Sequence, residues 1–196
     1  MALTFDDGPS GWTEPLLDLL GEADARATFF VLGASIAGNE TVLRRIAAEG
    51  HEVGNHTHRH LDLADAGDEL VAAELRAGAS AIAAVLGQKP RLVRPPYGAA
   101  PQRVARLAGA LSMGPVVMWS VDPADWRQRE PQPIVDSVLA QLEPGAIVDL
   151  HDGIPPNSTG EPSRQATVDA VAQLLPELRR RGYRLVTVSN LLDASP

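Results

Sequence analysis

Two adjacent carboxylates, Asp6 and Asp7, stand where a short apolar segment ends in Gly8-Pro9. One member of such a pair can hold a metal ion while the other accepts a proton. An aspartate before Gly-Pro is also common in ordinary turns, so the pair alone leaves both interpretations open. The metal interpretation needs further ligands, a proton donor and a pocket elsewhere in the chain.

Three histidines, His56, His58 and His60, lie within five positions. On one helical turn, the i, i+4 spacing puts His56 and His60 on the same face, where two imidazoles can reach one ion. In an extended segment all three rings would share a face instead. Adding one carboxylate of the Asp6-Asp7 pair gives a two-histidine, one-carboxylate site with open positions, which is typical of a catalytic ion. The chain has no cysteine, so we predict one divalent ion held by imidazole and carboxylate, with zinc as the best fit and cobalt or nickel also acceptable.

Such an ion lowers the pKa of its bound water toward about 7 and polarises a carbonyl group, so hydrolysis of an ester or amide becomes feasible. The second aspartate would then act as the base. His151 follows a different predicted strand and could donate a proton to the leaving group, which matters most when an amine leaves.

Two further polar segments could support this chemistry. In the segment 94–98, two prolines fix the turn, so Arg94 and Tyr97 are presented in a defined direction. An arginine beside a catalytic carboxylate keeps it ionised and oriented. In the segment 122–126, an aspartate could orient the imidazole of His151. Each of these two segments is a weak signal by itself.

The elements that must position these residues alternate along the chain. Strands are predicted at 2–5, 27–32, 52–54, 92–94, 116–121, 146–150 and 183–188, and apolar residues recur at helical spacing between them. Pro176 should kink or split the last of these helices. About seven strands alternating with helices imply parallel pairing and an α/β fold. An incomplete or distorted (β/α) barrel with outer helices and an open doubly wound sheet both fit this pattern.

In either architecture the site lies beyond the carboxyl ends of the strands. Polar clusters occur at five of these ends: 6–7, 56–60, 94–97, 122–126 and 151–152. Connections at the opposite end carry no comparable set. The clusters are therefore predicted to form one site at one rim.

Size and charge narrow the functional classes. The chain has 196 residues, of which 44% are hydrophobic, which suits one buried core and one domain. Its formal charge of −8 argues against nucleic acid as a partner, because such partners require a basic face. No segment has the roughly 20 consecutive apolar residues that span a membrane, and no signal-like segment precedes the first motif. We expect a monomer acting on a neutral or cationic substrate.

The residues resemble the polysaccharide deacetylase family, the NodB-homology domains of carbohydrate esterase family 4. Its five motifs occur in order: TFDDGP at 4–9, HTxxH at 56–60, RPPYG at 94–98, DxxDW at 122–126 and a histidine motif ending at 151. The resemblance implies a distorted (β/α) barrel over residues 1–196 and metal-dependent removal of N-acetyl groups from N-acetylglucosamine saccharides of chitin or peptidoglycan type. An acetylxylan esterase is the nearest alternative, because some members act on O-acetylated xylan. The resemblance also implies an extracellular or cell-envelope location.

The family pattern assigns different roles to the residues of the first two motifs. It assigns Asp6 as the general base and Asp7, His56 and His60 as the metal ligands, and it leaves His58 outside the ligand set.

The other motifs supply the supporting roles by the same resemblance. Arg94 would position the base, and Asp125 would position His151, the general acid. The backbone N–H of Tyr97 would help to hold the oxyanion, and Trp126 would wall the acetyl pocket. A catalytically silent sugar-binding domain would need no such complete set of base, ligands and acid.

One residue departs from the family pattern. The last motif usually carries a leucine two positions before the histidine, where it lines the pocket for the methyl group, but this chain has Asp149. Strand alternation puts Asp149 on the same side as His151. We expect Asp149 either to act as a second partner of His151 or to make the acyl pocket more polar, with a changed pH profile or substrate preference.

Overall fold

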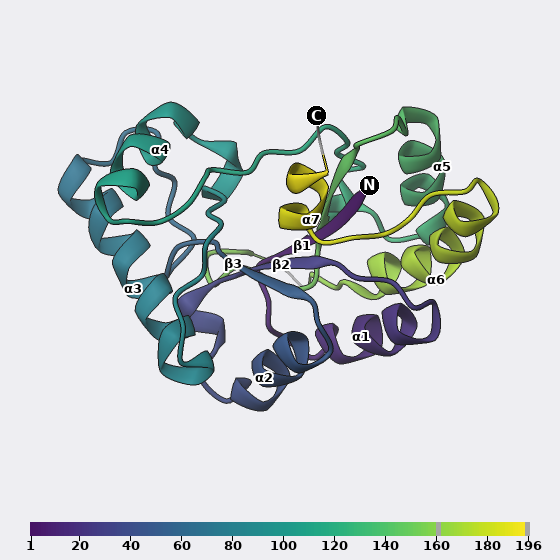
Figure 1. The fold of residues 1–196 in the computed structure, drawn as a ribbon, viewed down its shortest axis with the longest axis horizontal. Coiled ribbons are helices and arrows are strands. Elements are labelled where there is room, and N and C mark those ends of the chain that lie inside the picture. The colour runs from purple at the N-terminus through teal and green to yellow at the C-terminus, as the bar shows by residue number, and fades with distance from the viewer. Residues whose placement is uncertain (160–161, 195–196) are drawn as a thin grey trace.

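The computed structural model describes residues 1–159 and 162–194. Four parallel strands form one sheet in the order β3-β2-β1-β4, and helices lie around the outside of the strands (Figure 1). The strands are β1 (Ala2–Asp6), β2 (Thr28–Val31), β3 (Glu52–Asn55) and β4 (Ile147–His151). The helices are α1 (Thr13–Glu22), α2 (Glu40–Ala48), α3 (Asp68–Leu86), α4 (Pro101–Ala110), α5 (Pro131–Gln141), α6 (Gln165–Arg180) and α7 (Val188–Asp193), with short 3-10 helices η1 (Gly33–Ser35), η2 (Pro96–Gly98) and η3 (Asp125–Arg127). The predicted α/β fold with parallel pairing and outer helices is confirmed.

Two predicted strands are reduced to isolated residue pairs. The segment 92–94 pairs with the end of β3. The segment 116–121 pairs with the segment 92–94 and with β4. The parallel pairs are Asn55 with Val93, Val93 with Val116, and Val121 with Val148. The segments 92–94 and 116–121 therefore connect the two outer strands, β3 and β4, through successive parallel pairs.

In the C-terminal part, one predicted strand is wrong and one of the two outcomes predicted for Pro176 does not occur. The segment 183–188 forms no strand, because few of its groups pair with the sheet and its end belongs to α7, whose first turn is capped by the Thr187 hydroxyl. Pro176 does not split α6, which runs through it for four further residues. α6 is held by packing, since its buried apolar side chains lie in the main core.

The central strand β1 separates the core from the site. Leu3 and Phe5 on one face pack into the main hydrophobic cluster with residues of α1 and α6. Thr4 and Asp6 point to the opposite face, where both accept hydrogen bonds from the buried Arg94. Among the described residues, no helix has the length and apolar character that crossing a membrane requires.

Candidate metal centre and catalytic cleft

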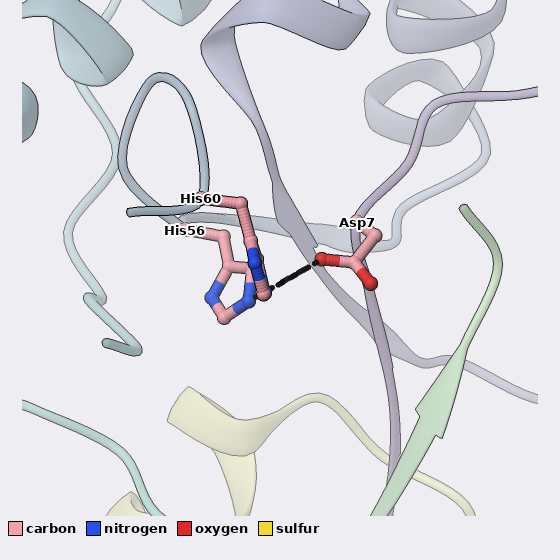
Figure 2. Close-up of side chains that lie close together, drawn as sticks. All are labelled: Asp7, His56 and His60. Carbon is pink, nitrogen blue, oxygen red and sulfur yellow. Dashed lines mark ion pairs between the residues drawn. The ribbon is translucent and has the colours of Figure 1, made fainter. Parts of the chain in front are cut away.

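Three buried side chains, Asp7, His56 and His60, converge at the carboxyl ends of β1 and β3 (Figure 2). The Asp7 Oδ1 atom lies 3.3 Å from His60 Nε2 and 3.5 Å from His56 Nε2. Two ligands about 2.1 Å from one tetrahedral ion lie about 3.4 Å apart, so these separations suit a shared ion. Asp7 Oδ1 and His60 Nδ1 are buried without a hydrogen-bond partner in the described chain. An unpaired buried carboxylate oxygen between two imidazoles is what a metal ligand set requires.

The His56 ring is oriented for ligation by its other nitrogen. His56 Nδ1 lies 2.8 Å from the Arg94 carbonyl oxygen and donates to it, so Nε2 carries the free lone pair. Burial lowers the pKa of His56, and it lowers the pKa of His60 to about 3. Both imidazoles are therefore neutral. Burial also raises the pKa of Asp7 to about 7, an effect that a bound divalent cation would oppose because it favours the carboxylate.

The two histidines meet through an irregular loop. The predicted helical turn and the extended alternative are both wrong: residues 56–60 are coil, with left-handed backbones at Thr57 (φ 71°) and His60 (φ 58°). The buried Glu74 of α3 accepts from the backbone N–H groups of His58 (3.2 Å) and Arg59 (2.8 Å). This anchor turns the loop so that the rings of His56 and His60 lie 5.2 Å apart.

The turn after β1 is held by Asp152, which follows β4. Asp152 accepts from the Gly8 backbone N–H at 3.1 Å and from the Thr13 hydroxyl at 2.5 Å. A side chain at Gly8 would lie 2.2 Å from Asp152 Oδ2, so only glycine permits this approach. The contact fixes where Asp6 and Asp7 leave the strand.

Arg94 joins the candidate base to Asp149. Its guanidinium is fully buried, and Nη1 donates to Asp6 Oδ1 at 2.9 Å and to Asp149 Oδ1 at 2.7 Å. The guanidinium also lies over the Phe30 ring, 4.1 Å from its centroid. Burial and the charge of Asp6 raise the pKa of Asp149 well above its usual value. Asp149 thus bonds Arg94, and no hydrogen bond joins it to His151 within the described residues.

His151 and Asp125 form the candidate acid on the other side. His151 Nδ1 lies 2.7 Å from Asp125 Oδ1, and Asp125 Oδ2 accepts from the His151 backbone N–H at 2.9 Å and the Thr167 hydroxyl at 2.6 Å. Burial alone would lower the pKa of His151, but the carboxylate of Asp125 outweighs it and raises that pKa to about 10. His151 therefore carries a proton at neutral pH.

One cleft of about 750 Å³ is lined by the candidate ligands, base and acid together with Asp149: Asp6, Asp7, His56, His60, Asp149 and His151. Tyr97 and Trp126 stand at its edge, with 60% and 54% of their surface exposed. The Tyr97 ring lies edge-on to His60, with centroids 4.6 Å apart, and its hydroxyl accepts from Asn157 at 3.0 Å. The sequence-predicted residues of all five motifs therefore lie at one site.

Several residues of this site were missed from the sequence. Arg164, just before α6, is buried and donates to the carbonyl oxygens of Gly153 (2.7 Å) and Trp126 (3.3 Å), so it ties two walls of the cleft together. Asn157 and Trp119 also line the cleft. No spacing or motif marks these residues, because their roles depend on contacts between distant segments.

Comparisons with known proteins agree with this geometry. Residues 1–116 match the family described as "Polysaccharide deacetylase". The chain is 43% identical over 189 residues to a chitooligosaccharide deacetylase of Bradyrhizobium sp. (strain ANU 289), covering 93% of this chain and 86% of that protein. This chain belongs to the polysaccharide deacetylase family.

Two other members of the family are also similar over nearly their whole length. A peptidoglycan-N-acetylglucosamine deacetylase of Bacillus cereus is 39% identical over 194 residues, covering 98% of this chain and 87% of that protein. A deacetylase structure solved with substrate superposes with a TM-score of 0.88 at 39% identity, covering 100% of this chain and 91% of that one. The fold around the cleft is therefore that of the polysaccharide deacetylases.

Proposed function

We propose that this polysaccharide deacetylase removes N-acetyl groups from N-acetylglucosamine residues of chitooligosaccharide or peptidoglycan type, with the help of one divalent metal ion. The observation that carries the proposal is the convergence of Asp7, His56 and His60 beside a second carboxylate, Asp6, and across from a protonated His151 in one cleft. The similarity to the chitooligosaccharide and peptidoglycan deacetylases supports the choice of an amino-sugar substrate.

Asp7, His56 and His60 would hold the ion, and zinc, cobalt or nickel would suit these ligands. The bound ion would polarise the acetyl carbonyl group and promote ionisation of the attacking water. Asp6 would accept the proton of that water, and Arg94, 2.9 Å from Asp6 Oδ1, would keep the carboxylate oriented.

His151 would donate a proton to the nitrogen of the leaving amine, with Asp125 fixing its ring. This acid favours an amide over an ester as the substrate, because an alkoxide leaves without such help more easily than an amide anion. The acetylxylan esterase alternative therefore has no feature of the cleft in its favour.

The backbone N–H of Tyr97 would receive the oxyanion. Tyr97 has a left-handed backbone (φ 57°) between Pro96 and Gly98 in η2. Its N–H donates to no acceptor in the parts of the chain that the structure describes. A donor that is already positioned stabilises the developing charge without reorganisation. Trp126 would form part of the wall beside the acyl group.

The parallel pairs that lead from β3 through the segments 92–94 and 116–121 to β4 support a distorted (β/α) barrel as the architecture that closes behind the cleft. Chitooligosaccharide or peptidoglycan as substrate would place the activity outside the cell or in its envelope. We propose one domain over residues 1–196, acting as a monomer.

One assay tests the function. The purified protein is stripped of metal, reloaded with zinc, cobalt or nickel, and incubated with chitooligosaccharides, peptidoglycan fragments and acetylated xylan, and products are followed by mass spectrometry. The expected result is loss of one acetyl mass from the amino-sugar substrates, abolished by Asp6→Asn. Acetate release from xylan alone would support the esterase, and no release with any metal would contradict the proposal.

A further inference from the structure

Asp149 lies at the bottom of the space between the candidate base and acid. In the pairing of β1 with β4, His151 is opposite Asp6 and Asp149 is opposite Thr4, one pleat further from the open rim. Asp149 is only 4% exposed, and it lines the same cleft as Asp6 and His151. It is therefore the floor of the site rather than part of its entrance.

Only one of the two carboxylate oxygens of Asp149 is bound. Arg94 Nη1 holds Oδ1 at 2.7 Å. Oδ2 accepts no hydrogen bond from the described residues, and it is not one of the fully buried polar atoms that lack a partner. It is therefore accessible from the cleft that Asp149 lines. An acyl group that fills the cleft excludes water from Oδ2. If it supplies no donor, the oxygen is left unpaired, which costs free energy, and an acyl group that supplies a donor avoids this cost.

The bound substrate must turn its acyl group toward this floor. Its carbonyl carbon has to lie between Asp6, which takes the proton of the attacking water, and His151, which protonates the leaving nitrogen. A saccharide is too large for the closed end of the cleft, so it leaves toward the open rim, where Tyr97 and Trp126 are exposed. The carbon attached to the carbonyl group then points toward Asp149 Oδ2.

We infer that Asp149 selects an acyl group that carries a hydroxyl next to the carbonyl group, so that N-glycolyl amino sugars are better substrates than N-acetyl ones. This inference rests on the proposed function. Glycolyl differs from acetyl by one hydroxyl on the terminal carbon, which is the smallest change that offers a donor to Oδ2. A methyl group offers none and leaves the carboxylate oxygen unpaired.

The reaction itself stays a hydrolysis. Water forms the new bond to the carbonyl carbon, the carbon–nitrogen bond breaks, the amine takes a proton, and glycolate is released in place of acetate. Asp149 does not exchange protons with the substrate and acts only on the choice of acyl group.

The test compares chitooligosaccharides that carry N-glycolyl or N-acetyl groups on the same reloaded enzyme. A hydrogen bond whose loss leaves a buried polar partner unpaired changes discrimination on the order of tenfold to hundredfold, so the parent should show a kcat/KM ratio of that size in favour of glycolyl. Asp149→Leu, with the same number of side-chain heavy atoms, should lose this preference. Asp149→Asn should keep it, because the amide still pairs with a hydroxyl.

The outcomes separate this inference from the proposed function. Acetate release by the parent with no preference for glycolyl, or an equal ratio in the parent and Asp149→Leu, would overturn the inference and leave the deacetylase intact. Release of neither acid would contradict the proposed function itself. A measurement without turnover adds a direct check: in ligand-observed NMR, glycolate should bind the parent more tightly than acetate does, and Asp149→Leu should bind the two alike. Equal binding of both acids to the parent would count against the inference.

Discussion

Replacing Arg94 with methionine should destabilise the protein strongly at neutral pH. Methionine keeps an apolar stem, but it removes the guanidinium that lies over Phe30 and donates to both Asp6 and Asp149. Arg94 has no exposed surface, so water cannot replace it. Removing one partner of a buried ion pair costs about 3–5 kcal/mol, because the charge left behind is uncompensated.

This cost should depend on pH. Without Arg94, the buried Asp149 carboxyl group can take up a proton, and burial already raises its pKa. An ordinary carboxyl group titrates near pH 4, and keeping it protonated costs about 1.4 kcal/mol for each pH unit above that value. The largest cost of protonating Asp149 in the folded variant is therefore about 4 kcal/mol at pH 7 and about 1.4 kcal/mol at pH 5. The Arg94 cation lowers the pKa of Asp149 in the parent, so its removal raises the folded-state pKa further, and the variant loses stability relative to the parent as the pH rises through this window.

Urea denaturation of the metal-stripped proteins at pH 5 and pH 7 measures both quantities. Arg106→Met is the matched control: Arg106 bonds Asp68 at 2.7 Å, but its side chain is 62% exposed. An exposed pair of this kind contributes less than about 1 kcal/mol. The reasoning is refuted if Arg94→Met costs no more than the control at pH 7, or if its cost is the same at both pH values.

Three further predictions concern the ligands, the acid and the loop. Zinc at about 100 times its dissociation constant should stabilise the parent by about 2.7 kcal/mol. His60→Ala should lose this gain in a thermal melt while His58→Ala retains it, and equal gains in both variants would contradict the ligand set. In the metal-stripped protein, the His151 ring should titrate well above its usual pKa of 6.5, near 10. Asp125→Asn should bring that pKa down in an NMR titration, and an unchanged value would show that Asp125 is not the cause. Glu74→Ala should cost about 2–3 kcal/mol in urea denaturation through the lost hydrogen bonds to the histidine loop, and a cost below 0.5 kcal/mol would show that the loop holds itself.

The side chains that each strand directs to the core or to the site could be predicted from the sequence, because strand geometry is local. Alternation along β1 puts Leu3 and Phe5 into the core and leaves Asp6 on the opposite face. The same alternation correctly puts Asp149 and His151 on one side of β4. The glycine that ends α3, Gly87, has the left-handed backbone (φ 73°) expected there.

The histidine loop was not predictable, because its shape depends on a distant side chain. The spacing of His56 and His60 fits a helical turn, but Glu74 captures two backbone N–H groups of the loop, and Thr57 adopts a left-handed backbone that no periodicity indicates. The strand at 183–188 failed for a related reason. Its apolar residues suit a strand and a helix start equally well, and the capping hydroxyl of Thr187 decides for α7.

Arg94 is the point at which the two sides of the site depend on each other. The same Nη1 atom holds the base Asp6 and the floor residue Asp149, and the Arg94 carbonyl oxygen fixes the ring of His56. Changing the floor therefore also changes the hydrogen bonds around the base, so absolute rates of Asp149 variants mix two effects. Selectivity between two acyl groups on one variant separates them, because the orientation of the base is common to both substrates and cancels in the ratio. By contrast, His151 is held by Asp125, which in turn accepts from Thr167, and it makes no bond to Arg94 among the described residues. The acid can therefore be altered without removing a hydrogen bond of the ligand side.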